Sequence, residues 1–175
     1  VDVVCGNPHF PDEQRRLISG TVGDTRVICA YMPNGQEVGC DKYDYKLRWL
    51  DGLAVWVGEE MAKYPKLALC GDYNIAPDDR DVHDPKRWAD CILVSPPERA
   101  AFQRFLGLGL SDSFRLFEQP EKTFSWWDYR MLGFQKNQGL RIDHVLLSKP
   151  LAEKCTAAGV DRAPRKLERP SDHAP

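Results

Sequence analysis

Residues 67–77 constrain the fold more than any other stretch, because an apolar run there leads directly into a carboxylate and an amide. The run Leu-Ala-Leu-Cys is followed by Gly71-Asp72-Tyr73-Asn74, and a proline closes the stretch. Short apolar runs bounded by glycine and proline are typical of buried strands. Side chains two residues apart in an extended chain point to the same face. Asp72 and Asn74 are therefore expected to project together from a strand end, where they could bind a cation, a water or a phosphate oxygen. An Asx turn that closes the strand is the alternative.

The length, net charge and hydropathy of the chain limit its number of domains, its contacts with nucleic acid and its relation to a membrane. A chain of 175 residues allows one domain with a sizeable core. The formal net charge of −2 gives no general positive field, so any contact with nucleic acid must come from local basic clusters. No apolar run approaches the ~18 residues that a membrane span needs.

The cysteines indicate a reduced protein. The six cysteines form no CxxC pair and show no ligand-like spacing with the four histidines. Cys29 and Cys70 lie inside apolar runs and are predicted to be small buried side chains. This usage predicts a cytoplasmic chain rather than one held together by disulfides.

A hairpin and two helices are predicted around the central strand. Gly23 and Asp24 make the expected turn, and the strand that follows ends at Tyr31, just before the turn signature Met-Pro-Asn-Gly. Residues 41–64 are predicted to form a helix, and a capping box at 95–98 starts another that ends at Gly107. The apolar positions that recur at helical spacing in the first helix are Leu47, Leu50, Ala54, Val57 and Met61.

Two later stretches place more polar residues beside strands or turns. Residues 139–148 form an apolar strand with Asp143 inside it, and His144 is expected to be structural because strand alternation turns it away from Asp143. The chain ends in Ser-Asp-His-Ala-Pro, where Asp172 and His173 form either a surface pair or part of a site. His83 lies in a charged stretch that predicts a surface loop, with a metal ligand as the alternative.

Residues 124–130, Phe-Ser-Trp-Trp-Asp-Tyr-Arg, are dense in aromatic side chains. Such a stretch could be a corner packed on the core. It could also be a wall that contacts a base or a sugar, with Arg130 near a phosphate. The residues alone leave both interpretations open.

Taken together and in order, these stretches resemble the endonuclease/exonuclease/phosphatase superfamily, and most closely its exonuclease III family of abasic-site endonucleases. Each motif is weak alone, but six in the order of the family are specific, and they cover nearly the whole chain. The motifs are Tyr31-Met-Pro-Asn-Gly35, Gly71-Asp-Tyr-Asn-Ile-Ala-Pro77, Lys86-Arg-Trp88, Phe124 to Arg130, Gly139 to Asp143, and Ser171 to Pro175.

The resemblance implies a DNase I-like fold, a four-layer α/β/β/α sandwich of two facing sheets flanked by helices. Residues 1–175 would then form a single domain. The family carries an Asn on its first strand, a metal-binding Glu soon after it and a final strand after the last motif. None of these is found here, so the chain is expected to be an internal piece that lacks the N-terminal part and the last strand.

The resemblance also implies the site. His173 and Asp143 would be a catalytic pair, Asp72 would orient a water or manage the proton of the leaving group, and Asn74 and Tyr31 would hold the phosphate. Metal ligands would come from Asp72, Asn74, Asp172 and His173, and Mg²⁺ is expected, with Mn²⁺ as the alternative ion. Substrate would contact Trp126, Arg130, Leu140 and Ile142, of which Trp126, Leu140 and Ile142 would line the pocket for a flipped-out abasic sugar.

The predicted function is a Mg²⁺-dependent DNA-repair nuclease that acts 5′ to abasic sites and as a 3′→5′ exonuclease on duplex DNA. A monomer with no membrane partner is expected. One alternative within the superfamily is a phosphatase or phospholipase, against which the aromatic motif argues. The alternative from another class is a DNA-binding fragment without catalysis, which the missing Glu would favour.

Overall fold

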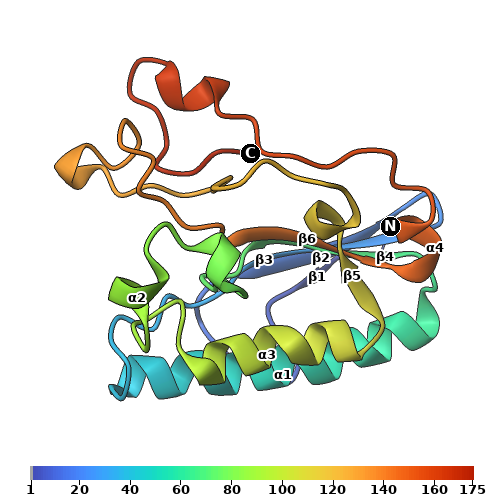
Figure 1. The fold of residues 1–175 in the computed structure, drawn as a ribbon. Helices are drawn as coiled ribbons and strands as arrows, with labels where there is room; N and C mark the ends of the chain where they lie inside the picture. The colour runs from blue at the N-terminus through green and yellow to red at the C-terminus, as the bar shows by residue number, and fades with distance from the viewer. Residues whose placement is uncertain (1) are drawn as a thin grey trace.

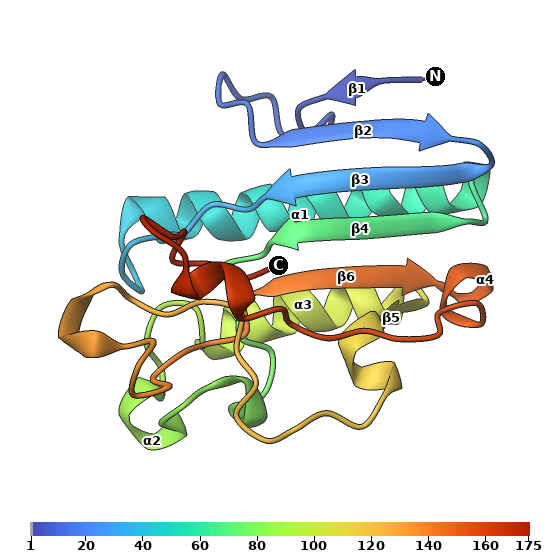
Figure 2. The ribbon, with the colours of Figure 1, turned by 90° about the horizontal axis from the view of Figure 1, so that it is seen from above.

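The computed structural model describes residues 2–175 and is built around one mixed six-stranded sheet. The strand order is β1-β2-β3-β4-β6-β5, in which β3 and β4 run parallel and every other neighbouring pair runs antiparallel (Figure 2). The predicted hairpin and central strand are present. The strands are β1 Val4–Cys5, β2 Leu17–Val22, β3 Thr25–Tyr31, β4 Leu67–Asp72, β5 Leu110–Asp112 and β6 Asp143–Ser148.

Two long helices cover one face of the sheet. They are α1, Asp41–Lys63, and α3, Pro96–Gly107, and Figure 1 shows both on the same side of the strands. The parallel β3–β4 pair needs a crossover, which α1 provides. The shorter helices are α2 Pro85–Trp88, α4 Lys149–Ala152 and the 3₁₀ turns Asp79–Asp81, Ser113–Leu116, Arg130–Leu132 and Ala163–Lys166.

The predicted bounds of both long helices are confirmed to within a residue. The buried side of α1 is centred on Trp49, Leu50, Leu53 and Val57, which belong to the main core under the sheet. The predicted positions Leu47, Ala54 and Met61 lie at the margin of this face and are half-buried. Two charged residues, Lys46 and Glu60, are also buried on α1.

The second helix begins as its capping box predicts. The carboxylate of Glu98 accepts hydrogen bonds from the backbone N–H of Ser95 at 3.1 Å and from its hydroxyl at 2.6 Å. Phe102 and Phe105 of α3 then pack against the ring of Tyr73, just beyond the end of β4. The residue after the central strand is thereby fixed in the core.

The opposite face of the sheet is covered unevenly. Loops from the last third of the chain lie over β6, whereas β1 to β4 are open to view on that side (Figures 1 and 2). The described residues therefore form one sheet and one helical layer of the predicted sandwich. The prediction that Cys29 and Cys70 are buried is wrong: Cys29 is exposed and Cys70 is half-buried. Strand alternation turns both away from the helices and toward this open face.

None of the helices in residues 2–175 combines the length and hydropathy that a membrane span requires.

Candidate active site

Three of the predicted site residues lie together where β4 ends and β6 begins. Asp72, the last residue of β4, lies directly opposite Asp143, the first residue of β6, in the antiparallel register. His173 arrives from the C-terminal segment. One ligand atom from each of these residues lies within 4.8 Å of the others, and no other group of this kind occurs in residues 2–175. The strand register therefore assembles a compact trio of two carboxylates and an imidazole.

The imidazole of His173 is oriented by Asp143. Its Nδ1 lies 2.9 Å from one oxygen of Asp143 and 3.1 Å from the other. A carboxylate only accepts, so Nδ1–H donates and Nε2 is left with a free lone pair. That Nε2 lies 3.9 Å from the carboxylate of Asp72. The arrangement presents a proton-accepting nitrogen toward the second carboxylate.

Backbone contacts hold the segment that carries His173 against the aromatic stretch. Trp126 and His173 form an isolated antiparallel bridge, and the N–H of Trp127 donates to the carbonyl of Asp172 at 3.0 Å. Ser125 holds Asp143, because its buried hydroxyl accepts from the N–H groups of Ile142 and Asp143 at 3.0 and 3.1 Å. One short stretch therefore positions both members of the pair.

Asp72 and Asn74 are joined by an Asx turn, as the alternative interpretation predicts, and Asp72 also belongs to the trio, whereas binding of a ligand by this pair stays a prediction. The N–H of Asn74 donates to Oδ1 of Asp72 at 2.8 Å, and its side-chain Nδ2 donates to Oδ2 at 3.1 Å. The same Nδ2 donates to the carbonyl of Met32 at 3.0 Å. Asn74 has φ 51°, a left-handed conformation that asparagine tolerates well. Both amide hydrogens are thus engaged in holding Asp72 and the neighbouring turn.

The electrostatics of the trio favour proton transfer. Burial, reinforced by the charge of Asp143, raises the pKa of Asp72 from 3.8 to about 6, although the Asn74 N–H opposes the rise. Burial disfavours the charged form of His173, but the hydrogen bond and charge of Asp143 outweigh it, with a smaller contribution from Asp72. The pKa of His173 is therefore raised above 6.5. The pKa of Asp72 is thus closer to neutral pH than that of a free carboxylate, and the charged form of His173 is favoured.

Tyr31 and Trp126 adjoin members of the trio, and Arg130 lines a cavity together with Trp126. Tyr31 ends β3 opposite Asp72 and is 54% exposed, with the guanidinium of Arg16 over its ring. Trp126 and Arg130 line a separate cavity of about 420 Å³, and no member of the trio lines it. The side chain of Arg130 is 88% exposed, so it is available to a phosphate.

The other predicted residues are not members of the trio. Leu140 and Ile142 are 0 and 2% exposed and belong to a buried cluster with Val82 and Leu93. Their assignment to a sugar pocket stays a prediction. The carboxylate of Asp172 accepts a hydrogen bond from the indole of Trp126 at 3.0 Å and is not a member of the trio, whose second carboxylate is Asp143.

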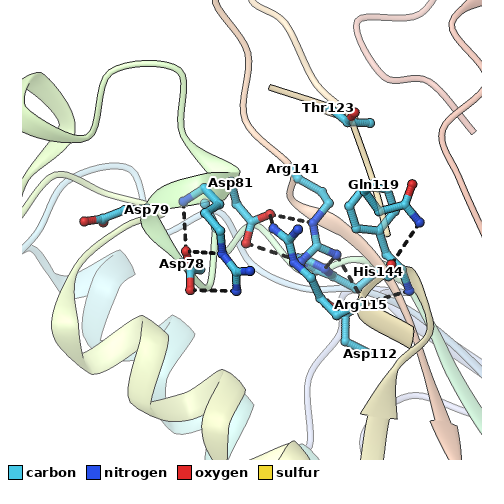
Figure 3. A network of polar contacts seen from close by, with 12 residues as sticks. Asp78, Asp79, Asp81, Asp112, Arg115, Gln119, Thr123, Arg141 and His144 are labelled. Atoms are coloured by element: carbon cyan, nitrogen blue, oxygen red, sulfur yellow. Dashed lines mark hydrogen bonds and ion pairs between the residues drawn. The ribbon is translucent and has the colours of Figure 1, made fainter. Parts of the chain in front are cut away.

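Behind the site, a buried ionic network holds the strand that carries Asp143. Arg141 donates to Asp81 at 2.7 Å and to Asp112 at 2.7 Å, and its side chain is 2% exposed. Figure 3 shows Arg141 between these two carboxylates, with His144 and Arg115 beside it. His144 accepts from Arg141 at 2.9 Å and donates to the carbonyl of Ile75, which confirms its predicted structural role. Burial lowers the pKa of His144 well below 6.5.

His83 lines the same cavity as Trp126, and its Nδ1 is 3.2 Å from the carbonyl of Gly139. It is not among the residues grouped as a candidate metal site within the described chain. The surface-loop interpretation fits this position.

Three residues that support the site were not identified from the sequence. They are Ser125, Asn34, whose amide donates to Oδ1 of Asn74 at 3.0 Å, and Lys46, whose ammonium donates to the carbonyl of Asn74 at 2.7 Å. A signal existed for Lys46, because a charged residue on the apolar face of a predicted helix needs a buried partner.

The donor set fits a hard divalent cation. Carboxylate oxygens from Asp72 and Asp143 converge beside a wide cavity of about 560 Å³, which leaves room for waters and a substrate phosphate. Mg²⁺ is commonly held in this way by one or two carboxylates together with waters and phosphate oxygens. The imidazole is the softer donor, and its Nδ1 is already taken by Asp143.

Comparison with known proteins gives matches over almost the whole chain. A model of the Endonuclease/Exonuclease/phosphatase family matches residues 4–173. Exodeoxyribonuclease III of Haemophilus influenzae is 39% identical over 94% of this chain, and the chain spans 66% of that relative's length.

Solved structures give the same result. A 3′ phosphatase from Neisseria, bound to a product DNA hairpin, superposes with a TM-score of 0.97 at 45% identity. An AP endonuclease from Archaeoglobus fulgidus superposes with a TM-score of 0.93 at 34% identity. In both cases the match covers 99% of this chain and 68% of the other. The predicted fold class and family resemblance are confirmed.

Proposed function

The chain belongs to the Endonuclease/Exonuclease/phosphatase family, and we propose that it carries the catalytic centre of a divalent-metal-dependent DNA-repair phosphodiesterase. The proposed reactions are 3′→5′ exonuclease cleavage and incision 5′ to abasic sites, both on duplex DNA. The similarity to an exodeoxyribonuclease III and an AP endonuclease supports this substrate class. The monomeric state and cytoplasmic location predicted from the sequence are part of the proposal.

The observation that carries the proposal is the contact between His173 and Asp143 beside Asp72. Hydrolysis of a phosphodiester needs an activated water, stabilisation of the charged phosphate and a proton for the leaving oxygen. The carboxylate of Asp143 keeps a proton on Nδ1 of His173, so that Nε2 can accept a proton and, once protonated, can donate to a phosphate oxygen. Asp72, with a pKa of about 6, can take a proton from the water or give one to the leaving oxygen.

The remaining groups orient these reacting atoms. Asn74 fixes both oxygens of Asp72, and Tyr31 would contact the phosphate from the neighbouring strand end. A bound divalent cation, held by Asp72 and Asp143 with Asp172 nearby, would supply positive charge against the phosphate. Trp126 and Arg130 would contact the DNA strand beside the site, and Leu140 and Ile142 would join them if the pocket opens on binding.

A second candidate is removal of a 3′ phosphate from DNA. The Neisseria protein that is 45% identical to this chain is a 3′ phosphatase bound to a DNA hairpin product. Attack of water on a terminal phosphate uses the same activated water and the same charge stabilisation as attack on a diester. The two reactions therefore share one site and differ in how the DNA end is held.

The proposal is tested with three labelled duplexes, which carry one abasic site, a recessed 3′ end or a 3′ phosphate. Each is incubated with the protein in Mg²⁺, in Mn²⁺ and in EDTA. We expect cleavage in Mg²⁺, which EDTA abolishes. Equal activity in EDTA would refute the metal assignment, and binding of all three duplexes without cleavage would support the non-catalytic alternative. The relative rates on the three duplexes separate the phosphatase from the nuclease reactions.

A further inference from the structure

Lys46 of α1 is fully buried and donates hydrogen bonds to two turns beside the candidate active site. Its side chain is 0% exposed, as is that of its ion-pair partner Glu98. An ammonium group has three donors. One donates to Glu98, one to the carbonyl of Asn34 at 3.1 Å and one to the carbonyl of Asn74 at 2.7 Å. The three donors of Lys46 are thus all used, and two of them reach the turns beside the trio.

The two turns that Lys46 binds are also bound to each other. The side-chain amide of Asn34 donates to Oδ1 of Asn74, and Asn74 in turn donates to both oxygens of Asp72. Gly35 lies directly over the stem of Lys46, where an added Cβ would be 3.0 Å from its Cδ, and φ is +91°. A continuous set of contacts therefore runs from Glu98 through Lys46 and Asn74 to Asp72.

Stability alone does not explain a lysine at this position. Replacing a buried ion pair by apolar side chains of similar volume is often neutral or stabilising. Glu98 does not depend on Lys46 for partners either, because it already accepts from the N–H groups of Leu93 and Ser95 and from the Ser95 hydroxyl. What an apolar residue could not provide is the pair of hydrogen bonds to the carbonyls of Asn34 and Asn74.

We propose that Lys46, held by Glu98, is a positioning residue that fixes the Asn74 turn and through it the carboxylate of Asp72. Lys46 touches neither substrate nor metal. Its role is to keep Asn74 in the left-handed conformation from which both of its N–H donors reach Asp72. The inference rests on the proposed function for its effect on catalysis, but its effect on the turn can be measured without activity.

The test compares two matched pairs of substitutions in the full chain. Lys46→Met with Glu98→Gln removes the charges and the two bonds to the turns, while glutamine can still accept at the helix cap. The control is Arg26→Met with Glu60→Gln, which removes a second buried pair, between β3 and α1, 2.7 Å apart and with side chains 2 and 5% exposed. Amide hydrogen exchange at Asn74, urea unfolding, and kcat and KM on the abasic duplex are measured for both pairs.

We expect the Lys46/Glu98 variant to exchange the Asn74 amide about 10-fold faster than the wild type, and to lose about 10-fold in kcat with KM within about threefold. The Arg26/Glu60 variant should keep the exchange rate of Asn74 and kcat within about threefold, at a comparable loss of stability. Unchanged exchange at Asn74 and unchanged kcat in the Lys46/Glu98 variant would overturn the inference.

If that variant does not fold, Asn34→Ala provides a second measurement. Asn34 is exposed, and the substitution removes its amide bond to Asn74 and the acceptor for the N–H of Gln36, while the backbone carbonyl that Lys46 binds is kept. Faster exchange at Asn74 in Asn34→Ala supports the positioning role, and wild-type exchange contradicts it. If the wild type does not cleave DNA at all, the proposed function fails, while the exchange comparison still decides the role of Lys46.

Discussion

Replacing Asp72 by asparagine should stabilise the protein while abolishing catalysis. The carboxylate of Asp72 is only 14% exposed and lies beside Asp143 in the sheet register. Burial and the neighbouring charge of Asp143 destabilise the ionised form of Asp72, which raises the pKa of Asp72 from 3.8 to about 6. Asparagine is nearly isosteric and keeps an oxygen that can accept from the N–H of Asn74. The substitution removes the buried charge and the acceptor of the Asn74 side-chain amide, and it keeps the acceptor of the backbone turn.

The size of the effect follows from proton linkage. A group whose pKa is raised on folding binds more protons in the folded state, so stability falls as pH rises from 3.8 to about 6. The full shift corresponds to about 3 kcal/mol, of which about 1.5 kcal/mol is already present at pH 5. The difference in unfolding free energy between Asp72→Asn and wild type should therefore grow by about 1.5 kcal/mol from pH 5 to pH 8. Loss of the contact with His173 acts in the same direction, because it removes stabilisation of the charged imidazole at acidic pH.

The assay is urea unfolding in EDTA at pH 5 and pH 8, with chelator present because a bound cation would offset the charge of Asp72. Asp90→Asn is the matched control, since Asp90 is exposed and has a left-handed φ of 58° that asparagine tolerates. For the control, the difference from wild type should be the same at both pH values. A difference for Asp72→Asn that is also independent of pH would refute the argument that Asp72 carries an unfavourable buried charge.

Two further predictions concern catalysis and DNA binding. His173→Ala should lower turnover of an abasic duplex by about 10²-fold with a much smaller change in affinity, and combining it with Asp143→Asn should cost far less than the product of the single effects because the two act as one unit. Multiplicative losses in a folded double variant would mean that they do not act as a pair. Arg130→Glu should reduce the slope of log affinity against log salt by about 0.9, as measured by fluorescence anisotropy, and an unchanged slope would exclude a phosphate contact by Arg130.

The central strand and the two long helices could be predicted because each rests on a local pattern, whereas the contact of His173 with Asp143 was expected from the family resemblance. The apolar run before Asp72 fixes β4, and the spacing of apolar residues in 41–64 fixes α1. Strand alternation correctly placed His144 in the core, behind Asp143. In each case the period of the secondary structure decides which way a side chain points.

The misplaced and missed residues depend on contacts that are distant in sequence. Cys29 lies in an apolar run, but whether its face of the sheet is covered depends on segments far along the chain. The partner of Lys46 is 52 residues away, and its bond to Asn74 spans 28 residues. Leu140 and Ile142 alternate with Arg141, yet all three are buried, because an ionic network encloses the arginine on the opposite face of the chain.

Both strand ends of the site are anchored by buried cations rather than by apolar packing alone. Arg141 holds the start of β6 through Asp81 and Asp112, and Lys46 holds the turn after β4 through Glu98. Buried ion pairs contribute little net stability, but breaking one by removing a single partner is strongly destabilising. Each ion pair therefore fixes a backbone position close to the site. Arg141 lies two residues before Asp143, and Asn74, which Lys46 binds, lies two residues after Asp72. Rigid support matters at this place, because Asp143 orients the imidazole of His173 and Asp72 lies opposite Asp143 in the same ladder.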